Sequence, residues 1–409
     1  MKRKAFIAQV GLLGTSALLA PASWAGGILA PGRQARVGVA VIGCGDRGKG
    51  LMHTIQTHLS DKYEIRGYCD TLDFRLQEAK RYANANARAT ADYRALLDAR
   101  SITAVVIATP LHEHFRIAKD AWLAGKHVYL EKTMAFTMKE AFDLADLVHA
   151  RPAQTFQVGY QYRASPLYAR VKQLIGDGTV GQVTQIDCRW DRNNNWRRPV
   201  PDPALERQIN WRMYREYSGG LVAELLSHQM DFVNWAFDTE PQQIAGFGGI
   251  DLFPDGRETF DNVQLTLRYK EGIVGNFGTT LGNARDGYLF KIKGTKGTIS
   301  LLTSTGMFYP EPAFKDAASG EIVDGVTGAT KIEPSADGGY QILPERTRDG
   351  TIYALEEFHH CIQTGATPSS NITTGAKGTL CMAMANQALY SSTIQHWDES
   401  YSERIRAKA

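Results

Sequence analysis

The sequence lacks an excess of charge of either sign once its first residues are set aside. It contains 46 Lys and Arg against 43 Asp and Glu, a formal net charge of +3. Three of those positive charges sit on Lys2, Arg3 and Lys4, and residues 1–25 contain no acid, so the rest of the chain is neutral. A protein that binds nucleic acid through its phosphates needs a cationic excess. We therefore expect no nucleic-acid partner, and an uncharged substrate or a locally charged pocket instead.

Cysteine is scarce, and long apolar runs are absent after residue 25. An odd and sparse set of thiols argues against a disulfide framework. Cys44 and Cys69 could approach one another if they end neighbouring strands, but separate buried thiols are the alternative. No later window approaches the roughly 18 apolar residues of a membrane span, so we expect no membrane contact after signal cleavage. The five cysteines are Cys44, Cys69, Cys188, Cys361 and Cys381.

The first 25 residues have the features of an export signal. A basic head precedes an apolar stretch over residues 5–20, and small residues follow at Ser23 and Ala25. Polar and glycine residues dilute that stretch, which makes a membrane anchor the weaker interpretation. We expect cleavage after about Ala25 and a periplasmic location. Residues 3–7 resemble a twin-arginine signal with one arginine replaced by lysine, so both the Sec and the Tat routes stay open. Residues 26–34 are expected to form a linker.

Short apolar runs alternate with helical patterns from residue 35 to residue 153. This alternation predicts right-handed crossovers and a parallel sheet, and therefore an α/β Rossmann dinucleotide-binding domain over residues 35–153. The expected strands are 37–42, 63–69, 104–108 and 127–130. The expected helices are 48–59, 74–83, 93–97, 114–124 and 138–149.

After residue 154 the pattern changes to runs in which apolar and polar residues alternate. It predicts an α+β domain over residues 154–367 with a large, mostly antiparallel open sheet. The expected strands are 180–190, 244–253, 262–269, 273–279, 288–293 and 297–302. The expected helices are 167–175, 220–237, 353–364 and 375–396. Residues 310–350 read as a surface excursion, and residues 368–409 as a C-terminal helix that packs back on the core.

A glycine-rich turn joins the first predicted strand to the first predicted helix. Gly43 allows a tight turn, Gly45 lets the backbone approach a pyrophosphate, and Gly48 lets the helix pack on the strand. The helix N-terminus supplies N–H donors for the phosphates. Asp70, at the end of the next strand, favours NAD over NADP, whereas Arg75 nearby keeps NADP open. The predicted cofactor-binding residues of this region are Gly43, Gly45, Asp46, Arg47, Gly48 and Asp70.

A predicted helix in the second domain places three polar residues on one face. Glu224, His228 and Asp231 stand at i, i+4 and i+7. A histidine beside a carboxylate is held in one orientation and its imidazolium is stabilised. Such a group suits the acceptance of a hydroxyl proton while hydride leaves the same carbon. The alternative is a core histidine satisfied by Glu224.

Two further motifs complete a resemblance to a known family. They are Thr109-Pro110-Leu111-His112-Glu113-His114 and the run AGKHVYLEKT over residues 124–133. With the glycine-rich turn and the helix of His228, they resemble the glucose–fructose oxidoreductase / inositol dehydrogenase / MocA (Gfo/Idh/MocA) family over roughly residues 36–300. The resemblance implies a Rossmann domain joined to an open sheet, a homo-oligomer formed through that sheet, and oxidation or reduction of sugars and polyols with NAD(P).

The resemblance also implies roles for individual residues. His228 accepts the hydroxyl proton, Lys132 bonds the reacting oxygen, and Glu224 orients the substrate or the histidine. Leu111, Thr133 and Glu224 stand where the family usually has asparagine, proline and aspartate. Losing the proline fixes Lys132 less rigidly. Further implied cofactor contacts are Thr109, Pro110, His114, Glu131 and Lys132, and the expected substrate contacts are Tyr160, Arg163, Trp211 and Asp231.

Residues 189–211 are rich in Trp, Arg and Asn. Aromatic faces and amide donors suit a sugar ring, although a solvated loop that packs its own tryptophans is the alternative. His112 and His114 lack a third metal ligand in the sequence, so we expect no metal.

Export and NAD together constrain the reaction, because no pool of free NAD is expected outside the cytoplasmic membrane. We therefore predict an NAD(H)-dependent oxidoreductase with a tightly bound cofactor, acting on a secondary hydroxyl of a sugar, polyol or glycoside. One alternative is a redox-neutral NAD-dependent glycoside hydrolase that uses transient C3 oxidation. A second is a non-catalytic dinucleotide- or sugar-binding protein.

Overall fold

Residues 36–285, 287–314 and 334–406 are described by a computed structural model. All of them belong to one compact unit of the chain. The predicted signal at residues 1–25 and the predicted linker at 26–34 lie outside the described residues.

The first sheet has six parallel strands in the order β3-β2-β1-β4-β5-β6. Alternate residues of β1 point to opposite faces: Ala40 and Ile42 join the hydrophobic cluster under α4 and α5, while Val39 and Val41 join the cluster under α1 and α10. The run is apolar throughout because both faces are covered. The strands are β1 (Val37–Ile42), β2 (Tyr63–Cys69), β3 (Arg88–Thr90), β4 (Ala104–Ile107), β5 (His127–Leu130) and β6 (Phe156–Val158).

Helices connect most of these strands, and the parallel Rossmann sheet predicted from the sequence is confirmed. The start of α5 shows how the sequence sets a boundary: Thr137 and Glu140 form a reciprocal capping box at its N-terminus. The helices are α1 (Asp46–His58), α2 (Asp73–Ala79), α3 (Arg94–Leu97), α4 (His114–Leu123) and α5 (Met138–His149).

Among the described residues the second sheet has nine strands in the order β14-β13-β12-β11-β7-β10-β9-β8-β15, and within this sheet only β7 and β10 pair in parallel. This confirms the mostly antiparallel sheet. Along β9, buried Val263, Leu265 and Leu267 alternate with exposed Gln264 and Thr266, so one face is packed and the other is open. The strands are β7 (Val183–Arg189), β8 (Pro241–Gly249), β9 (Asn262–Tyr269), β10 (Val274–Thr280), β11 (Leu289–Gly294), β12 (Gly297–Leu301), β13 (Gly306–Pro310), β14 (Tyr340–Gln341) and β15 (Gln395–His396).

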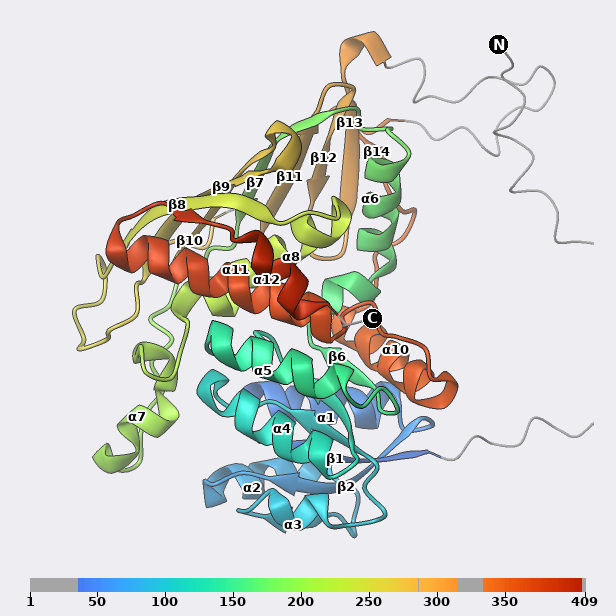
Figure 1. Cartoon of the computed structure of the whole chain (residues 1–409), viewed down its shortest axis with the longest axis vertical. Helices are drawn as coiled ribbons and strands as arrows, with labels where there is room; N and C mark the ends of the chain where they lie inside the picture. Colours follow the sequence, from blue (N-terminus) through green and yellow to red (C-terminus); the bar gives the residue numbers. More distant parts are fainter. Residues whose placement is uncertain (1–35, 286, 315–333, 407–409) are drawn as a thin grey trace, which may run out of the picture. The chain divides into compact units, whose positions relative to one another are not determined.

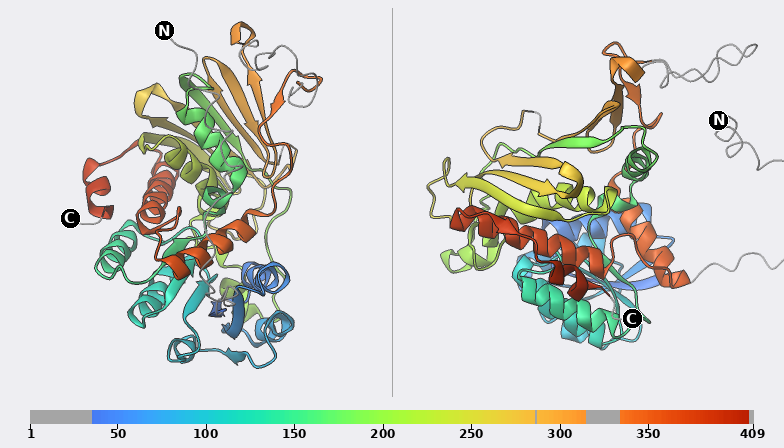
Figure 2. Two further views of the ribbon diagram at one scale, coloured as in Figure 1. Left: turned by 90° about the vertical axis from the view of Figure 1, so that its right-hand side faces the viewer. Right: turned by 45° about the horizontal axis from the view of Figure 1, so that its top comes forward.

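The long helix α11 (Ile372–Ser391) lies between the two sheets, as Figures 1 and 2 show. It contacts α5 and β6 on the Rossmann side and α8 and β8 on the other side. A single hydrophobic cluster therefore runs from Ile107 of β4 through Leu380 of α11 to Phe277 of β10. The remaining helices are α6 (Pro166–Gly176), α7 (Glu206–Ile209), α8 (Ser227–Ala236), α10 (Gly350–Thr364) and α12 (Glu399–Ile405).

The structure refines two local predictions. The helix expected over 220–237 contains a π-helix at Val222–Leu226, followed by α8. The surface excursion expected over 310–350 contains β14, which pairs with β13, because short edge strands carry too few residues to show an alternating pattern. Within the described ranges, no helix combines the length and the apolar character needed to cross a bilayer.

Candidate active site

A cavity of about 1070 Å³ lies between the Rossmann domain and the second domain. Its walls include the glycine-rich turn after β1, the carboxyl ends of β2, β4 and β5, the segment after β7, and the π-helix with the start of α8. Ligands of open α/β sheets bind at the carboxyl ends of the strands. The cavity occupies that position.

The three glycines of the turn differ in what surrounds them. Gly43 has φ +93°, and a Cβ there would come within 2.6 Å of the Ala108 backbone; one at Gly48 would lie 1.8 Å from the Gly43 carbonyl oxygen. A Cβ on Gly45 would meet nothing nearer than the Arg75 guanidinium at 4.0 Å. Gly45 therefore faces open space in the cavity, whereas Gly48 packs α1 on β1 and lies outside the cavity lining.

Asp70 is buried, and its carboxylate stabilises the turn. Oδ2 accepts the Cys44 N–H at 2.8 Å and Oδ1 accepts the Leu72 N–H at 3.0 Å. Arg75 Nη1 lies 3.9 Å from Oδ2. Each carboxylate oxygen keeps a further lone pair, so Asp70 can still accept a hydrogen bond from a ribose hydroxyl.

The residues present fit a dinucleotide. Thr109 Oγ1 and His112 Nδ1 are buried, line the cavity and have no hydrogen-bond partner among the described residues. Buried polar atoms without partners are rare in native proteins, so a bound polar group is the natural partner. Asp46, Arg47, Pro110 and Glu131 also line the cavity. Together with the open face of Gly45, these residues would hold the cofactor.

Lys132 is anchored by the π-helix. It follows β5, and its Nζ donates to the carbonyl oxygens of Glu224 at 3.0 Å and Ala223 at 3.4 Å. A π-helix replaces the i→i+4 hydrogen-bond pattern locally and is frequent at functional sites. An ammonium has three N–H donors, so Lys132, which lines the cavity, keeps one for a ligand. The lysine is thus more firmly placed than the loss of proline at Thr133 led us to expect.

His228, which also lines the cavity, is held neutral. It is 5% exposed, and the rings of Tyr160, Tyr162 and Trp190 surround it at centroid distances of 5.9, 5.3 and 5.3 Å. Burial lowers the pKa of His228 well below its ordinary value, and the positive charge of Lys132 lowers it further. Its Nδ1 is buried without a partner among the described residues. A neutral imidazole with a free nitrogen is able to accept a proton.

Glu224 is ionised and paired with a residue that the sequence patterns did not single out. Arg212 Nε donates to Glu224 Oε2 at 2.8 Å. Burial alone raises the pKa of the Glu224 carboxyl, but Arg212 and Lys132 outweigh it and lower the pKa to about 2. Glu224 therefore does not contact His228 as a satisfied core pair would; its carboxylate faces Arg212 in the cavity wall.

Glu131 and His114 line the cavity and are bonded to neighbouring segments. Glu131 Oε1 accepts from Arg47 Nε at 2.7 Å, which joins the end of β5 to the start of α1. The ring nitrogens of His114 face the carbonyl oxygens of Thr133 at 2.8 Å and Thr109 at 3.1 Å. Burial lowers the pKa of His114, and a neutral imidazole has one N–H, so only one of these contacts is a hydrogen bond.

Three of the four predicted substrate residues do not line the cavity. Arg163 and Asp231 form a buried bidentate ion pair, with Nε and Nη2 each 2.8 Å from a carboxylate oxygen. Tyr160 is buried against the Gly378 backbone of α11. Glu224 and His228 line the cavity, whereas Asp231, three residues after His228 in α8, does not. The substrate roles of Tyr160, Arg163 and Asp231 stay predictions.

The fourth predicted substrate residue, Trp211, does line the cavity, with Arg212 stacked over its ring at 4.3 Å. Trp190, Trp196 and Arg192 from the same tryptophan-rich stretch also line it. An aromatic and cationic wall of this kind suits the faces and hydroxyls of a sugar.

All five cysteines are buried and free. Cys44 and Cys69 do come close, with Cys44 Sγ 3.4 Å from the Cys69 carbonyl oxygen, yet they form no disulfide. Within the described ranges no cluster of three His, Cys, Asp or Glu side chains is placed to hold a metal ion, and the absence of a metal stays a prediction.

Comparison with protein families identifies both halves of the chain. The family model for "Oxidoreductase family, NAD-binding Rossmann fold" matches residues 37–160. The family model for "GFO/IDH/MocA C-terminal domain" matches residues 168–300. The two matches together span more than half of the chain and confirm the predicted cofactor, NAD.

Curated relatives carry several activities. The chain is 27% identical to uncharacterized oxidoreductase sll0816 of Synechocystis over 74% of this chain and 80% of that protein. It is 29% identical to levoglucosan dehydrogenase of Pseudarthrobacter phenanthrenivorans over 54% of this chain and 60% of that protein. A glycosyl hydrolase family 109 protein of Shewanella sp. strain ANA-3 is 30% identical over 49% of this chain and 46% of that protein.

Solved structures share the fold. An oxidoreductase domain protein from Kribbella flavida superposes with a TM-score of 0.71 at 20% identity, over 89% of this chain and 100% of that one. A levoglucosan dehydrogenase in complex with NADH and levoglucosan superposes with a TM-score of 0.68 at 21% identity, over 88% of this chain and 99% of that one. The chain therefore belongs to the Gfo/Idh/MocA family of NAD-dependent oxidoreductases.

Proposed function

We propose that this oxidoreductase acts on a secondary hydroxyl of a sugar, polyol or glycoside and keeps its NAD tightly bound through the reaction. The observation that carries the proposal is that Lys132 and His228 line one cavity together with the glycine-rich turn, close enough for the charge of Lys132 to lower the pKa of His228. The two residues come from different domains, and each is held in place by its surroundings.

The nicotinamide, His228 and Lys132 each have a separate part in the reaction. A bound nicotinamide supplies the acceptor or donor of hydride. His228, neutral because of its burial and of Lys132, accepts the proton of the substrate hydroxyl. The remaining N–H of Lys132 bonds the same oxygen and stabilises the negative charge that develops on it. In the reverse direction His228 returns the proton.

Glu224 and Arg212 hold the cavity wall in position and take no part in the proton transfer. The carboxylate of Glu224 is ionised and bonded to Arg212, so it is no proton donor near neutral pH. Their ion pair orients the wall that carries Trp211, where a sugar face can stack. Two relatives, levoglucosan dehydrogenase and inositol 2-dehydrogenase/D-chiro-inositol 3-dehydrogenase, support a cyclic polyhydroxy substrate.

The redox-neutral glycosidase is the second candidate, favoured by the 30% identity to a family 109 glycosyl hydrolase. In this reaction a transient C3 ketone acidifies the C2 proton and permits loss of the C1 substituent. The same Lys132 and His228 serve the oxidation and the final reduction. Net reduction of NAD distinguishes the two candidates.

We also propose that the protein works in the periplasm. The support is the basic head and apolar stretch within residues 1–25, which lie outside the described residues. An exported enzyme must retain its cofactor, because no pool of free NAD replaces it.

The test starts with protein purified from the periplasmic fraction without added cofactor. Its absorbance gives the bound nicotinamide, and a set of sugars, polyols and aryl glycosides is then added. A stoichiometric rise in bound NADH with a sugar supports the oxidoreductase, while release of the aryl group without NADH supports the glycosidase. Recovery of cofactor-free protein contradicts tight retention, and binding without any turnover leaves the non-catalytic binding protein.

A further inference from the structure

The segment between β7 and the π-helix reaches across to the Rossmann domain. Residues 191–214, called the bridging segment below, contribute Arg198 and Gln208 to the cavity lining. Arg198 Nη2 donates to Asp46 Oδ2 at 2.6 Å. Gln208 Nε2 donates to Thr71 Oγ1 at 2.8 Å. Two side chains of the bridging segment therefore form hydrogen bonds with two places in the Rossmann domain.

These contacts end at the positions expected to hold a dinucleotide. Asp46 is the first residue of α1 and directly follows Gly45, where the diphosphate meets the helix N-terminus. Thr71 directly follows Asp70, the predicted ribose contact. All four residues line the cavity. The two bridges thus stand at the diphosphate end and at the ribose end of the adenosine half.

The Arg198–Asp46 pair also offsets the repulsion between the Asp46 carboxylate and a bound diphosphate. A carboxylate at the start of α1 is stabilised by the helix dipole, but it repels an incoming diphosphate. Arg198 Nη2 pairs with Asp46 Oδ2 at 2.6 Å, Lys49 Nζ lies 3.9 Å from Asp46 Oδ1, and a guanidinium has five N–H donors in all. Arg198 therefore places a cation beside the diphosphate position and still bridges the domains.

Arg198 is held in register by a buried side chain. Asn210 Oδ1 accepts the Arg198 N–H at 2.6 Å, and Asn210 Nδ2 donates to the Arg198 carbonyl oxygen at 3.0 Å. Asn210 is only 2% exposed. Both backbone polar groups of Arg198 are thus satisfied by one residue, which fixes the direction in which its side chain leaves the segment.

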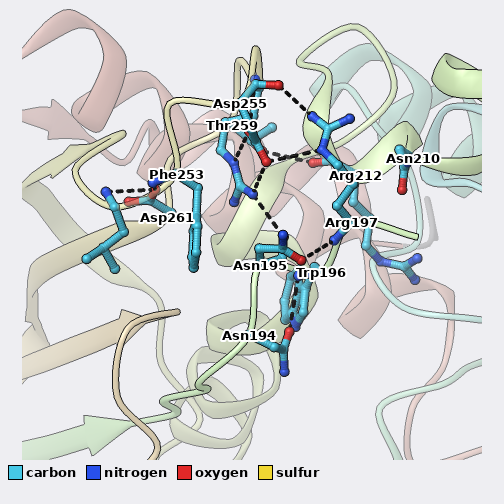
Figure 3. A network of polar contacts seen from close by, with 12 residues as sticks. Asn194, Asn195, Trp196, Arg197, Asn210, Arg212, Phe253, Asp255, Thr259 and Asp261 are labelled. Carbon is cyan, nitrogen blue, oxygen red and sulfur yellow. Dashed lines mark hydrogen bonds and ion pairs between the residues drawn. The ribbon is translucent and has the colours of Figure 1, made fainter. Parts of the chain in front are cut away.

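A second network anchors the segment on the loop after β8 (Figure 3). Arg257, whose side chain is 1% exposed, donates to both carboxylate oxygens of Asp255 at 2.9 and 2.8 Å and to the Asn195 carbonyl oxygen at 2.9 Å. Arg197 bonds the same Asp255 at 3.1 Å. Trp196 has φ +59°, and its N–H bonds Asn194 Oδ1 at 3.1 Å. The bridging segment is therefore held in place by several hydrogen bonds and ion pairs.

We propose that the bridging segment is a clamp that closes over the bound dinucleotide through Arg198 and Gln208 and makes its dissociation slow. The adenosine half leaves the cavity only after both contacts open. The proposal deepens the proposed function, since it names the residues that retain NAD and rests on that retention.

The experiment measures how fast NADH leaves the protein. Wild type, Arg198→Ala, Gln208→Ala and the double variant are loaded with NADH and mixed with a large excess of NAD⁺, and the loss of NADH fluorescence is followed. An exposed ion pair or hydrogen bond of this kind changes a rate by about threefold, so each single variant releases NADH about threefold faster and the double variant about tenfold faster. Arg198→Lys, which keeps the charge, releases NADH close to the wild-type rate.

Lys139→Ala serves as the matched control, because Lys139 pairs with Asp143 on the surface and neither residue lines the cavity. It releases NADH at the wild-type rate. A double variant that keeps the wild-type release rate while remaining folded overturns the clamp, as does wild-type protein that loses NADH during mixing. The release rate needs no sugar substrate. Failure of every sugar to reduce the bound NAD would overturn the proposed function and leave the clamp standing, and equal release rates would do the reverse.

Discussion

Replacing Lys132 by methionine tests the role of the ammonium in the reaction. Lys132→Met keeps the length and apolar stem of the side chain and removes the charge. Two of the three N–H groups bond the carbonyl oxygens of Glu224 and Ala223 at 3.0 and 3.4 Å, so the third is fixed before substrate arrives. A preorganised donor of this kind contributes about 10²–10³ in kcat when it faces the developing negative oxygen.

We expect Lys132→Met to lower kcat by about 10²-fold while the protein still binds NAD. Lys132→Arg is the matched variant, because it keeps the charge but replaces a compact ammonium with a planar, longer group; it retains NAD and also loses most of the activity. The assay is the single-turnover reduction of bound NAD by the substrate found in the screen. Turnover of the methionine variant within about threefold of wild type, with NAD bound, refutes the role of Lys132.

Two other predictions concern stability. Arg163→Met leaves the Asp231 carboxylate buried without its partner, so urea unfolding should show a loss of about 3–5 kcal/mol. The double variant Arg163→Met/Asp231→Leu should recover most of that loss, and an equally unstable double variant contradicts the pairing argument. The second prediction is that stability falls as pH drops below about 6.5, because burial lowers the pKa of His228 and His114 in the fold and only the unfolded chain takes up their protons. Each contributes at most about 1.4 kcal/mol per pH unit. His228→Asn should make the pH dependence shallower, and an unchanged slope contradicts the neutral, buried state of His228.

The parts of the fold that the sequence predicted are those set by local patterns. The glycine-rich turn between β1 and α1 needs only Gly43, Gly45 and Gly48 at a fixed spacing after an apolar strand. The alternation along β9 likewise shows in the residues themselves, and its predicted bounds, 262–269, match the strand Asn262–Tyr269. Both features depend on residues that are close in sequence, so they can be predicted from sequence patterns.

The parts that it missed depend on contacts between distant residues. Lys132 bonds carbonyl groups 91 and 92 positions away, and the π-helix that presents them cannot be told from an α-helix by side-chain type. Arg163 and Asp231 are 68 positions apart, so their pairing left no periodic signal. Arg212 adjoins the predicted Trp211, and that adjacency was the one available hint of its place in the cavity wall.

The structure of the protein with NAD bound tests directly whether Lys132 and His228 act on a substrate at the nicotinamide. We expect the diphosphate at the glycine-rich turn, the adenosine ribose at Asp70, and the nicotinamide ring in the part of the cavity lined by Lys132, Glu224 and His228. A nicotinamide ring outside that part of the cavity, or with Lys132 and His228 both turned away from it, would rule out the proposed roles of these two residues.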